Sequence, residues 1–334
     1  MKKIFQSAAW KRHSKKKALK LLKRKQKNEK TKGHSAYVNK KAGYKSVKKR
    51  QNRIEIEAPP NFSIINNLDE TLDFFEAMQR YIEKGVTIFL DLSRVVKLTT
   101  DAILYMLSRI EYNRSLNYKS SISGNAPRDE NCNKILRTSG FYKYVYADSS
   151  MDGTNDASVY SVESDIKVEP SKAKGIKDFA KKCLNKSESS DEKNIYKILI
   201  ECMANTKNHA YTANSSYAKW WLMASFDEKT KRIRFTFVDN GLGIPKTIRK
   251  RWRETIREVF GVLRVHDSDL IFSALKGEFR TQTGFSYRGK GLPRIHETAK
   301  GKIADLVIIS RRGYVNCSND DKRELKKCFH GTLL

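Results

Sequence analysis

The chain has 334 residues, of which 39% are hydrophobic and 10% aromatic, so it can bury the cores of two ordinary domains and is not a wholly disordered protein. Its net charge of +30 is uneven, because residues 1–53 hold 21 Lys and Arg against one acidic residue, whereas the remainder holds 46 against 36. The five cysteines are odd in number and lack C-x-x-C spacing, which argues against a structural zinc site or a disulfide framework.

The basic residues 1–53 form the first segment, with a net charge of 21 − 1 = +20. They contain too little apolar surface to offset the loss of chain entropy, so we expect a disordered or helical arm. Such a charge neutralises nucleic-acid phosphates regardless of base sequence. We therefore expect non-sequence-specific nucleic acid as a partner, with a solvated tail or contact with anionic lipid as the alternatives.

Strands and helices alternate over residues 54–147, which predicts a small α/β domain. The expected strands are 54–58, 86–92 and 121–124, and the expected helices are 69–84, 100–113 and 129–139. The continuous apolar run V-T-I-F-L-D-L is typical of a strand that is covered on both faces. A polar, breaker-rich stretch follows, and we assign residues 148–162 to a linker.

A second domain is expected over residues 163–334. A first predicted helix ends near Leu184. A second covers 195–209 and follows a capping-box pattern from Ser189 to Glu192. The expected strands are 220–226, 232–238, 304–310, 314–317 and 328–333. Hairpin connections imply an antiparallel sheet that helices cover on one face. In R-I-R-F-T-F-V (232–238), apolar residues alternate with polar ones, which predicts that the other face is solvated.

A polar stripe interrupts the apolar 195–209 helix. Glu201 and Asn205 are one helical turn apart, and Asn208 and His209 follow one turn later. Two glycine-rich segments come next, V-D-N-G-L-G-I-P (238–245) directly after a strand and R-G-K-G-L-P-R-I (288–295) before a short helix. Glycine lets the backbone approach a ligand closely, and the amides at a helix start attract phosphate.

In this order, Glu-x-x-x-Asn, Asp-x-Gly-x-Gly, Gly-x-Gly-Leu and a terminal Gly-Thr resemble the GHKL ATPase superfamily. That group includes gyrase-type topoisomerases, large heat-shock chaperones, sensor histidine kinases and mismatch-repair ATPases. The resemblance covers the whole of residues 163–334 and implies a Bergerat-type α/β sandwich that binds ATP and Mg²⁺. It also implies that Asn205 coordinates the Mg²⁺ ion and that Glu201 orients or deprotonates the attacking water.

The same resemblance implies the other ATP contacts. Asp239 would accept a hydrogen bond from the adenine amino group, and Gly241 and Gly243 would let the chain pass close to the base. Thr332 would support the adenine pocket. The residues expected to contact the phosphates are Asn208, His209, Gly289, Lys290 and Gly291. His209 equally fits a helix-end histidine. Residues 246–285 would form the ATP lid, with Arg280 or Thr281 reaching a phosphate.

Residues 54–147 resemble a STAS domain, the fold of anti-sigma-factor antagonists. The resemblance rests on I-F-L-D-L-S (88–93), the turn T-T-D-A (99–102) and T-S-G-F (138–141). Thr100 falls where the antagonists carry a phosphoacceptor serine, but the acid before it and the glycine after it are absent. The resemblance implies a docking or dimerisation module for an unknown protein partner, and it leaves a homodimer open.

These resemblances predict an ATP-hydrolysing conformational switch, coupled to the STAS-like domain and the basic arm. The alternatives are a serine/threonine protein kinase of the anti-sigma-factor type and a nucleotide-dependent binding module that does not hydrolyse ATP. A sensor histidine kinase is disfavoured, because no histidine lies on a helix directly before the ATP-binding residues. No apolar run reaches the ~20 residues that span a bilayer, and the first residues lack a signal-peptide core. We therefore expect a cytoplasmic protein without a membrane span.

Overall fold

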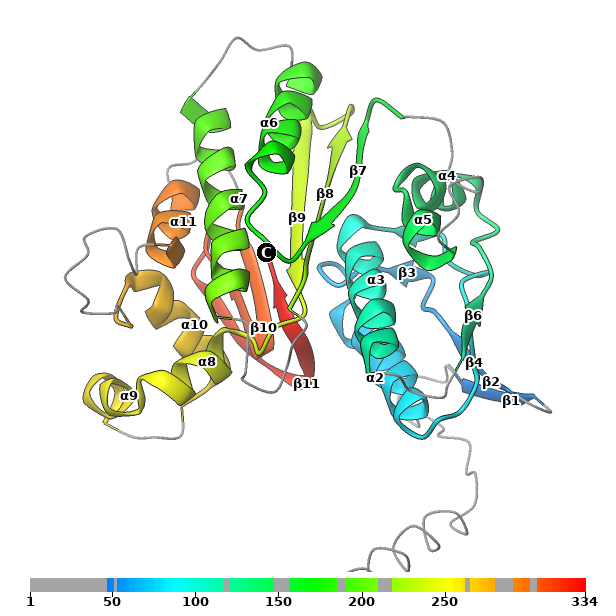
Figure 1. Ribbon diagram of the computed structural model, residues 1–334, viewed down its shortest axis with the longest axis horizontal. Helices are drawn as coiled ribbons and strands as arrows, with labels where there is room; N and C mark the ends of the chain where they lie inside the picture. Colours follow the sequence, from blue (N-terminus) through cyan, green and yellow to red (C-terminus); the bar gives the residue numbers. More distant parts are fainter. Residues whose placement is uncertain are drawn as a thin grey trace, which may run out of the picture. The chain divides into compact units, whose positions relative to one another are not determined.

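The computed structural model describes residues 47–50, 53–116, 121–146, 156–184, 190–209, 218–261, 265–279, 291–300 and 305–334. The predicted arm therefore lies outside the described residues except at its end. There Val47–Arg50 form strand β1, so the expectation of a disordered or helical arm is wrong for these residues. Residues 48–334 form one compact unit of mixed α/β structure (Figure 1). Among the described helices, none is both long enough and apolar enough to cross a membrane.

The parallel-sheet region comprises the described residues between 47 and 146. Its main sheet has the order β1-β2-β4-β6, and β4 pairs in parallel with both β2 and β6. The strands are β1 (Val47–Arg50), β2 (Arg53–Glu57), β4 (Ile88–Asp91) and β6 (Ile122–Gly124), with a separate parallel pair of β3 (Asn61–Phe62) and β5 (Lys97–Leu98). The helices are α2 (Leu68–Glu83), α3 (Thr100–Ser115), α4 (Glu130–Thr138) and α5 (Phe141–Tyr146). Every strand and helix predicted over 54–147 is confirmed, with small shifts at the ends.

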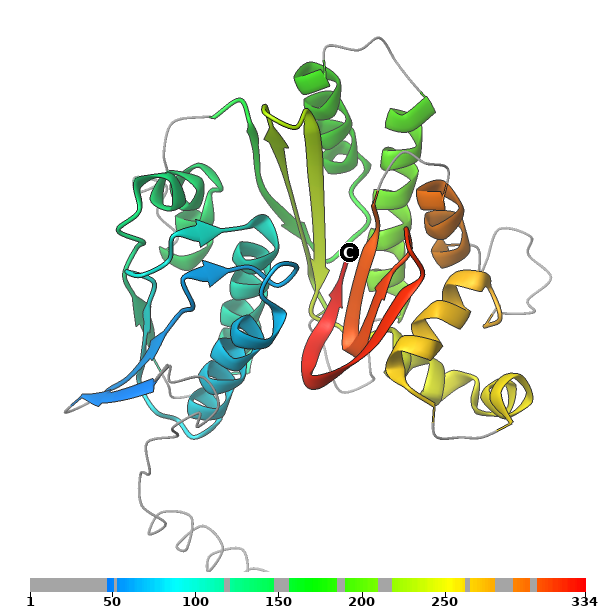
Figure 2. The same ribbon diagram turned by 180° about the vertical axis from the view of Figure 1, so that it is seen from behind.

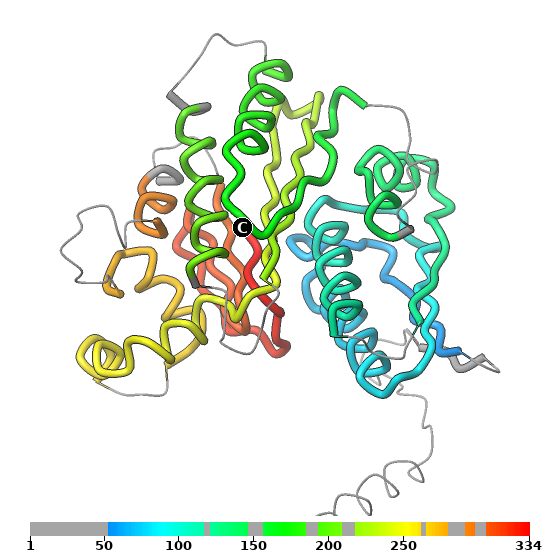
Figure 3. The backbone as a smooth tube through the Cα atoms, in the orientation of Figure 1, coloured from blue at the N-terminus to red at the C-terminus, as the bar shows by residue number. Residues whose placement is uncertain are grey.

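The antiparallel-sheet region comprises residues 156–334. Its five strands have the order β10-β11-β9-β8-β7, and each neighbouring pair is antiparallel. They are β7 (Val159–Asp165), β8 (Trp220–Asp227), β9 (Arg232–Asp239), β10 (Val307–Asn316) and β11 (Asp321–Leu333). The last strand thus returns between β9 and β10 (Figure 3). The predicted antiparallel sheet is confirmed, but β7 begins inside the predicted 148–162 linker. The strands predicted at 304–310 and 314–317 are one strand, β10, and the strand predicted at 328–333 begins earlier, at Asp321.

Six helices accompany this sheet: α6 (Pro170–Leu184), α7 (Ser190–His209), α8 (Ile244–Arg251), α9 (Arg253–Phe260), α10 (Asp267–Lys276) and α11 (Gly291–Lys300). Figures 1 and 2 show α6 and α7 side by side on one face of the sheet. Their core combines Leu199 and Met203 of α7 with Trp220, Leu222 and Phe237 of the strands. Burial of such side chains contributes about 1.5–3 kcal/mol each.

The expectation of a lid over residues 246–285 is wrong for its central part. Helix α10 packs on β10, where Ile271 and Leu275 are buried with Ile308 and Val315. Gly313 of β10 lies so close to α10 that it has no room for a Cβ atom. Residues 267–276 therefore belong to the packed core, since they contribute buried side chains to it. Residues 280–290 lie outside the described part.

The expectation that one face of the antiparallel sheet is solvated is wrong for the second half of β9. Arg232 and Arg234 are exposed, as predicted, but Thr236 is buried. The reason is that α3 packs against β8 and β9. All residues of α3 from Thr100 to Ile110 are consequently buried. A helix that is buried on every side has no polar face for a sequence pattern to show.

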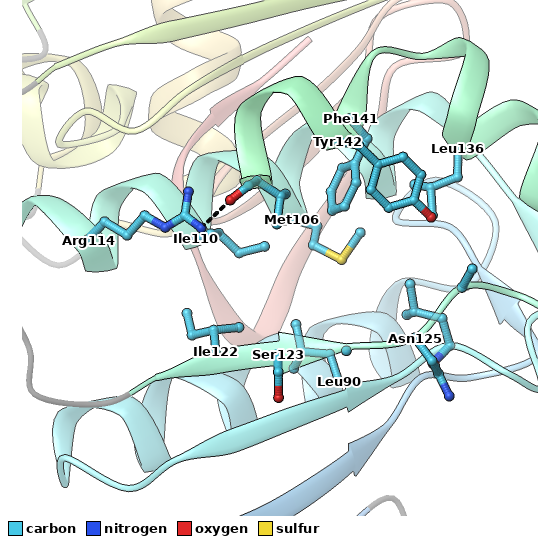
Figure 4. A pocket seen from close by; sticks show the side chains of 14 residues that line it. Leu90, Met106, Ile110, Arg114, Ile122, Ser123, Asn125, Leu136, Phe141 and Tyr142 are labelled. Carbon is cyan, nitrogen blue, oxygen red and sulfur yellow. Dashed lines mark hydrogen bonds between the residues drawn. The ribbon is translucent and has the colours of Figure 1, made fainter. Parts of the chain in front are cut away.

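The parallel-sheet region also contains an apolar cavity of about 180 Å³. Met106 points into it from α3, Phe141 from α5, and Leu90 and Ile122 line it from the strands (Figure 4). At one end Arg114 donates hydrogen bonds to the carbonyl oxygens at the end of α5, at 3.0 and 2.6 Å. The cavity is therefore a gap between α3, α5 and the β4–β6 edge.

Candidate functional site

The polar stripe of α7 faces the first residue of α11. A Cβ atom on Gly291 would lie 2.9 Å from Glu201 Oε2 and 3.3 Å from both Nδ2 and Oδ1 of Asn205. The two helices are in contact along this line. Arg294, one turn into α11, donates a hydrogen bond of 3.0 Å to Glu201 Oε1. The structure thus brings together Glu201, Asn205 and Gly291, three residues that the sequence motifs mark.

Asp239 ends β9 and begins the glycine-rich turn. Its Oδ1 accepts a hydrogen bond of 2.8 Å from the backbone N–H of Gly241. Gly243 has a φ of +82° and precedes α8, so the turn needs a residue without a Cβ at that position. The Asp239 side chain is only 8% exposed. Burial raises the pKa of its carboxyl to about 6, although Gly241 and Thr332 donate hydrogen bonds to it.

Thr332 lies opposite Asp239 in the pairing of β11 with β9. Its neighbour Gly331 has a φ of +97°, and a Cβ atom there would overlap the carbonyl oxygen of Asp239. The Ser310 hydroxyl lies 3.1 Å from the Thr332 hydroxyl and 3.0 Å from the Gly331 carbonyl oxygen. It also accepts the Ile244 N–H at 2.9 Å. These contacts fix Thr332 beside Asp239 and join β11 to the start of α8.

Cys202 of α7 lies close enough to both groups of residues for their charges to act on it. Burial, and then the charges of Asp239 and Glu201, raise the pKa of the Cys202 thiol. The Asp239 carboxylate is therefore near α7, where Glu201 directly precedes Cys202. The helix face of the sheet thus presents an acidic acceptor near the end of β9 and a Glu–Asn pair at the α7–α11 contact.

The other predicted site residues are not brought to this place by the described structure. Asn208 is exposed, and its carbonyl oxygen accepts a hydrogen bond of 3.4 Å from Arg251 Nη2. His209 is the last residue of α7, and its side chain lies outside the described part. The same is true of four further predicted contacts: Gly289, Lys290, Arg280 and Thr281.

Two residues that complete the arrangement have no predicted role. Arg294 lies inside the quoted R-G-K-G-L-P-R-I segment, so its position one turn after Gly291 could have indicated a contact with α7. Ser310 carries no comparable signal, because it is one polar residue within a strand. Its three contacts depend on the pairing of β10 with β11 and on the turn before α8.

Thr100, the position of the antagonist phosphoacceptor, is not accessible in this structure. It is the first residue of α3 and only 4% exposed. Its hydroxyl oxygen lies 2.7 Å from the hydroxyl oxygen of Thr236 on β9. The following Asp101 is equally structural, since its Oδ2 accepts the backbone N–H groups of Ile64 and Ile65 at 2.6 and 3.0 Å.

The site offers oxygen atoms that could ligate a metal ion, but it has few negatively charged side chains. Among the described residues, no group of three or more His, Cys, Asp and Glu side chains could hold a metal ion. A metal ion beside Asn205 would need most of its ligands from a bound molecule and water, as Mg²⁺ usually takes them at phosphate sites. No protein-family model, curated protein or solved structure matches the chain.

Proposed function

We propose that residues 156–334 bind Mg-ATP as a GHKL-type domain and hydrolyse it, so that the protein acts as a nucleotide-driven conformational switch. The observation that carries the proposal is the contact of Gly291 with Glu201 and Asn205. Three motif residues that are far apart in the sequence meet there, at the start of a helix. The amides at a helix start favour phosphate, so the contact supports a nucleotide whose phosphates lie at the start of α11, beside Glu201 and Asn205.

Asp239 would select the adenine base. A carboxylate acceptor at the end of β9 suits the exocyclic amino group of adenine. An ionised carboxylate accepts hydrogen bonds and donates none, so it can accept from the amino group as well as from Gly241 and Thr332. A pKa of about 6 leaves Asp239 ionised at neutral pH. Thr332 and Ser310 hold this side of the site in place.

Asn205 would hold Mg²⁺ through its side-chain oxygen, and the ion would neutralise charge on the phosphates. Glu201 would accept a proton from the attacking water at a carboxylate oxygen. Arg294 donates to Glu201 Oε1, which leaves Oε2, on the Gly291 side, for this role. Arg294 is thus a positioning residue for Glu201.

A binding experiment tests the adenine contact. The Asp239→Asn substitution replaces the charged acceptor, and the loss of a charge-assisted hydrogen bond costs about 1.5–3 kcal/mol. We expect calorimetry at neutral pH to show about 10- to 100-fold weaker Mg-ATP binding than in the parent. Asp305→Asn, at an exposed position before β10, is the matched control and should leave the affinity unchanged. Unchanged affinity in Asp239→Asn contradicts the assignment.

A turnover experiment tests the hydrolytic role of Glu201. With γ-labelled ATP and Mg²⁺, the parent should release labelled free phosphate. Glu201→Ala should bind ATP but lose turnover by about 10²–10⁴-fold, the contribution of a general base. Glu297→Ala removes an exposed glutamate of α11 and should retain turnover. Equal turnover in Glu201→Ala and the parent excludes Glu201 as the base.

The same experiment separates hydrolysis from the alternative of a serine/threonine protein kinase. Label on protein rather than in free phosphate would identify a kinase. Thr100 as the fused acceptor is disfavoured, because its hydroxyl is buried against Thr236. No label in either product, with ATP binding retained, would identify a nucleotide-dependent binding module.

We further propose that the STAS-like region, residues 54–147, reports the nucleotide state to a protein partner, and that the arm, residues 1–53, contacts nucleic acid. The net charge of +20 on the arm supports the contact with nucleic acid. Full-length protein should bind unrelated duplexes with similar affinity, and that affinity should fall steeply as salt rises. A chain that starts at residue 54 should lose most of this binding.

A further inference from the structure

A second cavity, of about 280 Å³, lies between α2, α3 and β11. Its size is just below the usual range of small-molecule pockets, about 300–1,000 Å³, which limits any ligand to a small one. Leu72 and Phe75 of α2 and Tyr105 of α3 form an apolar wall. Arg109, Lys327 and His330 bring nitrogen groups to the same space, and Cys328 lines it from β11.

The feature that distinguishes this cavity is the guanidinium of Arg109. The residue is only 4% exposed. Among the described residues, its partners are Gln79, whose Oε1 accepts a hydrogen bond of 2.6 Å, and the ring of Tyr112, 4.8 Å away. Neither partner carries a negative charge. A buried charge without a counter-ion is unfavourable, so an anion that enters the cavity would offset this cost.

The carboxylates at the rim of the cavity are engaged elsewhere. Glu76 pairs with Arg80 at 3.5 Å, and Glu83 accepts a hydrogen bond of 2.9 Å from Gln79 Nε2. Both glutamates are exposed. Among the described contacts, neither glutamate forms an ion pair with Arg109.

The other basic groups keep the interior positive or neutral. Lys327 forms an ion pair with Asp73. His330 is exposed, yet partial desolvation, and then the charges of Arg109 and Arg311, lower its pKa to about 4. It is therefore neutral at pH 7 and can donate one N–H.

We propose that this cavity binds a small organic anion, with a carboxylate or phosphate head on Arg109 and an apolar body against Leu72, Phe75 and Tyr105. The guanidinium fork matches the geometry of either head group and can donate two parallel hydrogen bonds. The site is separate from the proposed nucleotide site. It nevertheless shares β11 with it, because His330 directly precedes Gly331 and Thr332.

Cys328 provides a direct measurement of occupancy. It is half-buried in the cavity wall, whereas Cys183, on α6, is half-buried outside the cavity. The full-length protein would be treated with N-ethylmaleimide, and labelling at each cysteine followed by mass spectrometry. The probes are benzoate and phenyl phosphate, with neutral benzyl alcohol as the matched probe without charge. We expect both anions to remove most labelling of Cys328, to leave Cys183 unaffected, and benzyl alcohol to protect neither.

A substitution then tests the role of Arg109. Arg109→Gln should weaken probe binding by about 10- to 100-fold, the usual effect of losing one charge-assisted pair. Arg253→Gln, at an exposed position of α9, is the control. If Arg109→Gln does not fold, Arg109→Lys keeps the charge but not the fork, and should weaken binding less. The proposal is overturned if no anion protects Cys328, if benzyl alcohol protects it equally, or if protection survives in Arg109→Gln.

Discussion

The two faces of the five-stranded sheet are covered in chemically different ways. On one face, α6, α7 and α11 cover an apolar layer that includes Trp220 and Phe237. On the other face, α3 contacts β8 and β9. There the contacts are a hydroxyl pair, the ion pair of Lys219 with Glu111 at 2.6 Å, and the stacked rings of Tyr105 and Phe329, 4.0 Å apart.

This difference separates two roles. Apolar burial is non-directional, and it tolerates exchanges of similar volume. Hydrogen bonds and ion pairs require each partner at its place, so a single loss leaves a buried group unpaired. The helix face therefore provides a stable support for the candidate site, whereas the α3 face specifies one arrangement of the helix against the sheet.

The largest expected effect on stability is at Gly331, in strand β11. In Gly331→Ala, the methyl group would overlap the carbonyl oxygen of Asp239, which is backbone and cannot turn away. We expect a loss of more than about 4 kcal/mol in the free energy of unfolding, in the range of severe defects. Urea denaturation measures it, or expression fails because the chain does not fold.

Gly261→Ala is the control for backbone strain. Gly261 also has a positive φ, +68°, but nothing lies within 4 Å of the position of a Cβ. This variant should lose only about 1–2 kcal/mol, the cost of the left-handed conformation for alanine. Similar losses in the two variants would contradict the close approach of β11 to β9.

The next effect concerns Asp239 and pH. Its folded-state pKa of about 6 is above the ordinary value of 3.8. The folded protein therefore keeps this proton longer than the unfolded chain, and the free energy of unfolding should fall as pH rises from about 4 to 6. Each pH unit between the two pKa values is worth about 1.4 kcal/mol, so the penalty at pH 7 is about 3 kcal/mol. Asp239→Asn should remove this slope and stabilise the nucleotide-free protein at pH 7.

Asp156 serves as the control, because its contribution to stability changes with pH in the opposite direction to that of Asp239. Hydrogen bonds from Ser158, and then the interaction with Lys134, lower its pKa to about 2. Its contribution is present above pH 4 and is lost as pH falls toward 2. Asp156→Asn should therefore reduce stability at pH 7. Urea midpoints at pH 4, 5.5 and 7 compare the variants, and a parental slope in Asp239→Asn would show that Asp239 titrates normally.

A smaller effect is expected for the ion pair on the α3 face. The side chains of Lys219 and Glu111 are only 17% and 14% exposed. Glu111→Gln leaves the ammonium partly buried without its charge partner, and should cost about 2 kcal/mol. The double substitution with Lys219→Met should cost less than the two single losses together, because no unpaired charge remains. Purely additive losses would show that the pair is not coupled.

The exposed pair of Arg232 with Asp305 is the matched control. These side chains are 80% and 72% exposed, and their atoms are 3.9 Å apart. Asp305→Asn should change stability by less than about 0.5 kcal/mol. A loss as large as that of Glu111→Gln would mean that burial does not distinguish the two pairs.

The amphipathic elements were predictable from the sequence, and the α3 face was not. Helix α2 places Leu72, Phe75, Met78 and Ile82 at helical spacing, and all four are buried. Thr236, in contrast, alternates with apolar residues like any solvated strand position. Its burial depends on α3, whose contact with β9 joins residues more than a hundred positions apart. Local periodicity carries no information about such a contact.

The candidate site divides in the same way. Glu201, Asn205, Asp239, Gly291 and Thr332 could be selected because motifs mark them. The contributions of Arg294 and Ser310 arise from tertiary contacts. The lid was misassigned because its central helix, α10, has the polar start and apolar spacing of any surface helix, and only packing against β10 shows that it belongs to the core.

The smallest effect is expected for the hydroxyl pair of Thr100 and Thr236. Both residues are buried, and their oxygen atoms are 2.7 Å apart. Thr100→Val keeps the shape but leaves the Thr236 hydroxyl without this partner, which should cost about 1 kcal/mol, and Thr236→Val should do the same. With both replaced, no hydroxyl is left unpaired, so the double variant should be more stable than the sum of the single losses predicts. Urea denaturation of the four proteins gives the coupling free energy. A coupling of zero would show that the hydroxyl pair does not hold α3 on the sheet, and that the aromatic stack and the ion pair are sufficient.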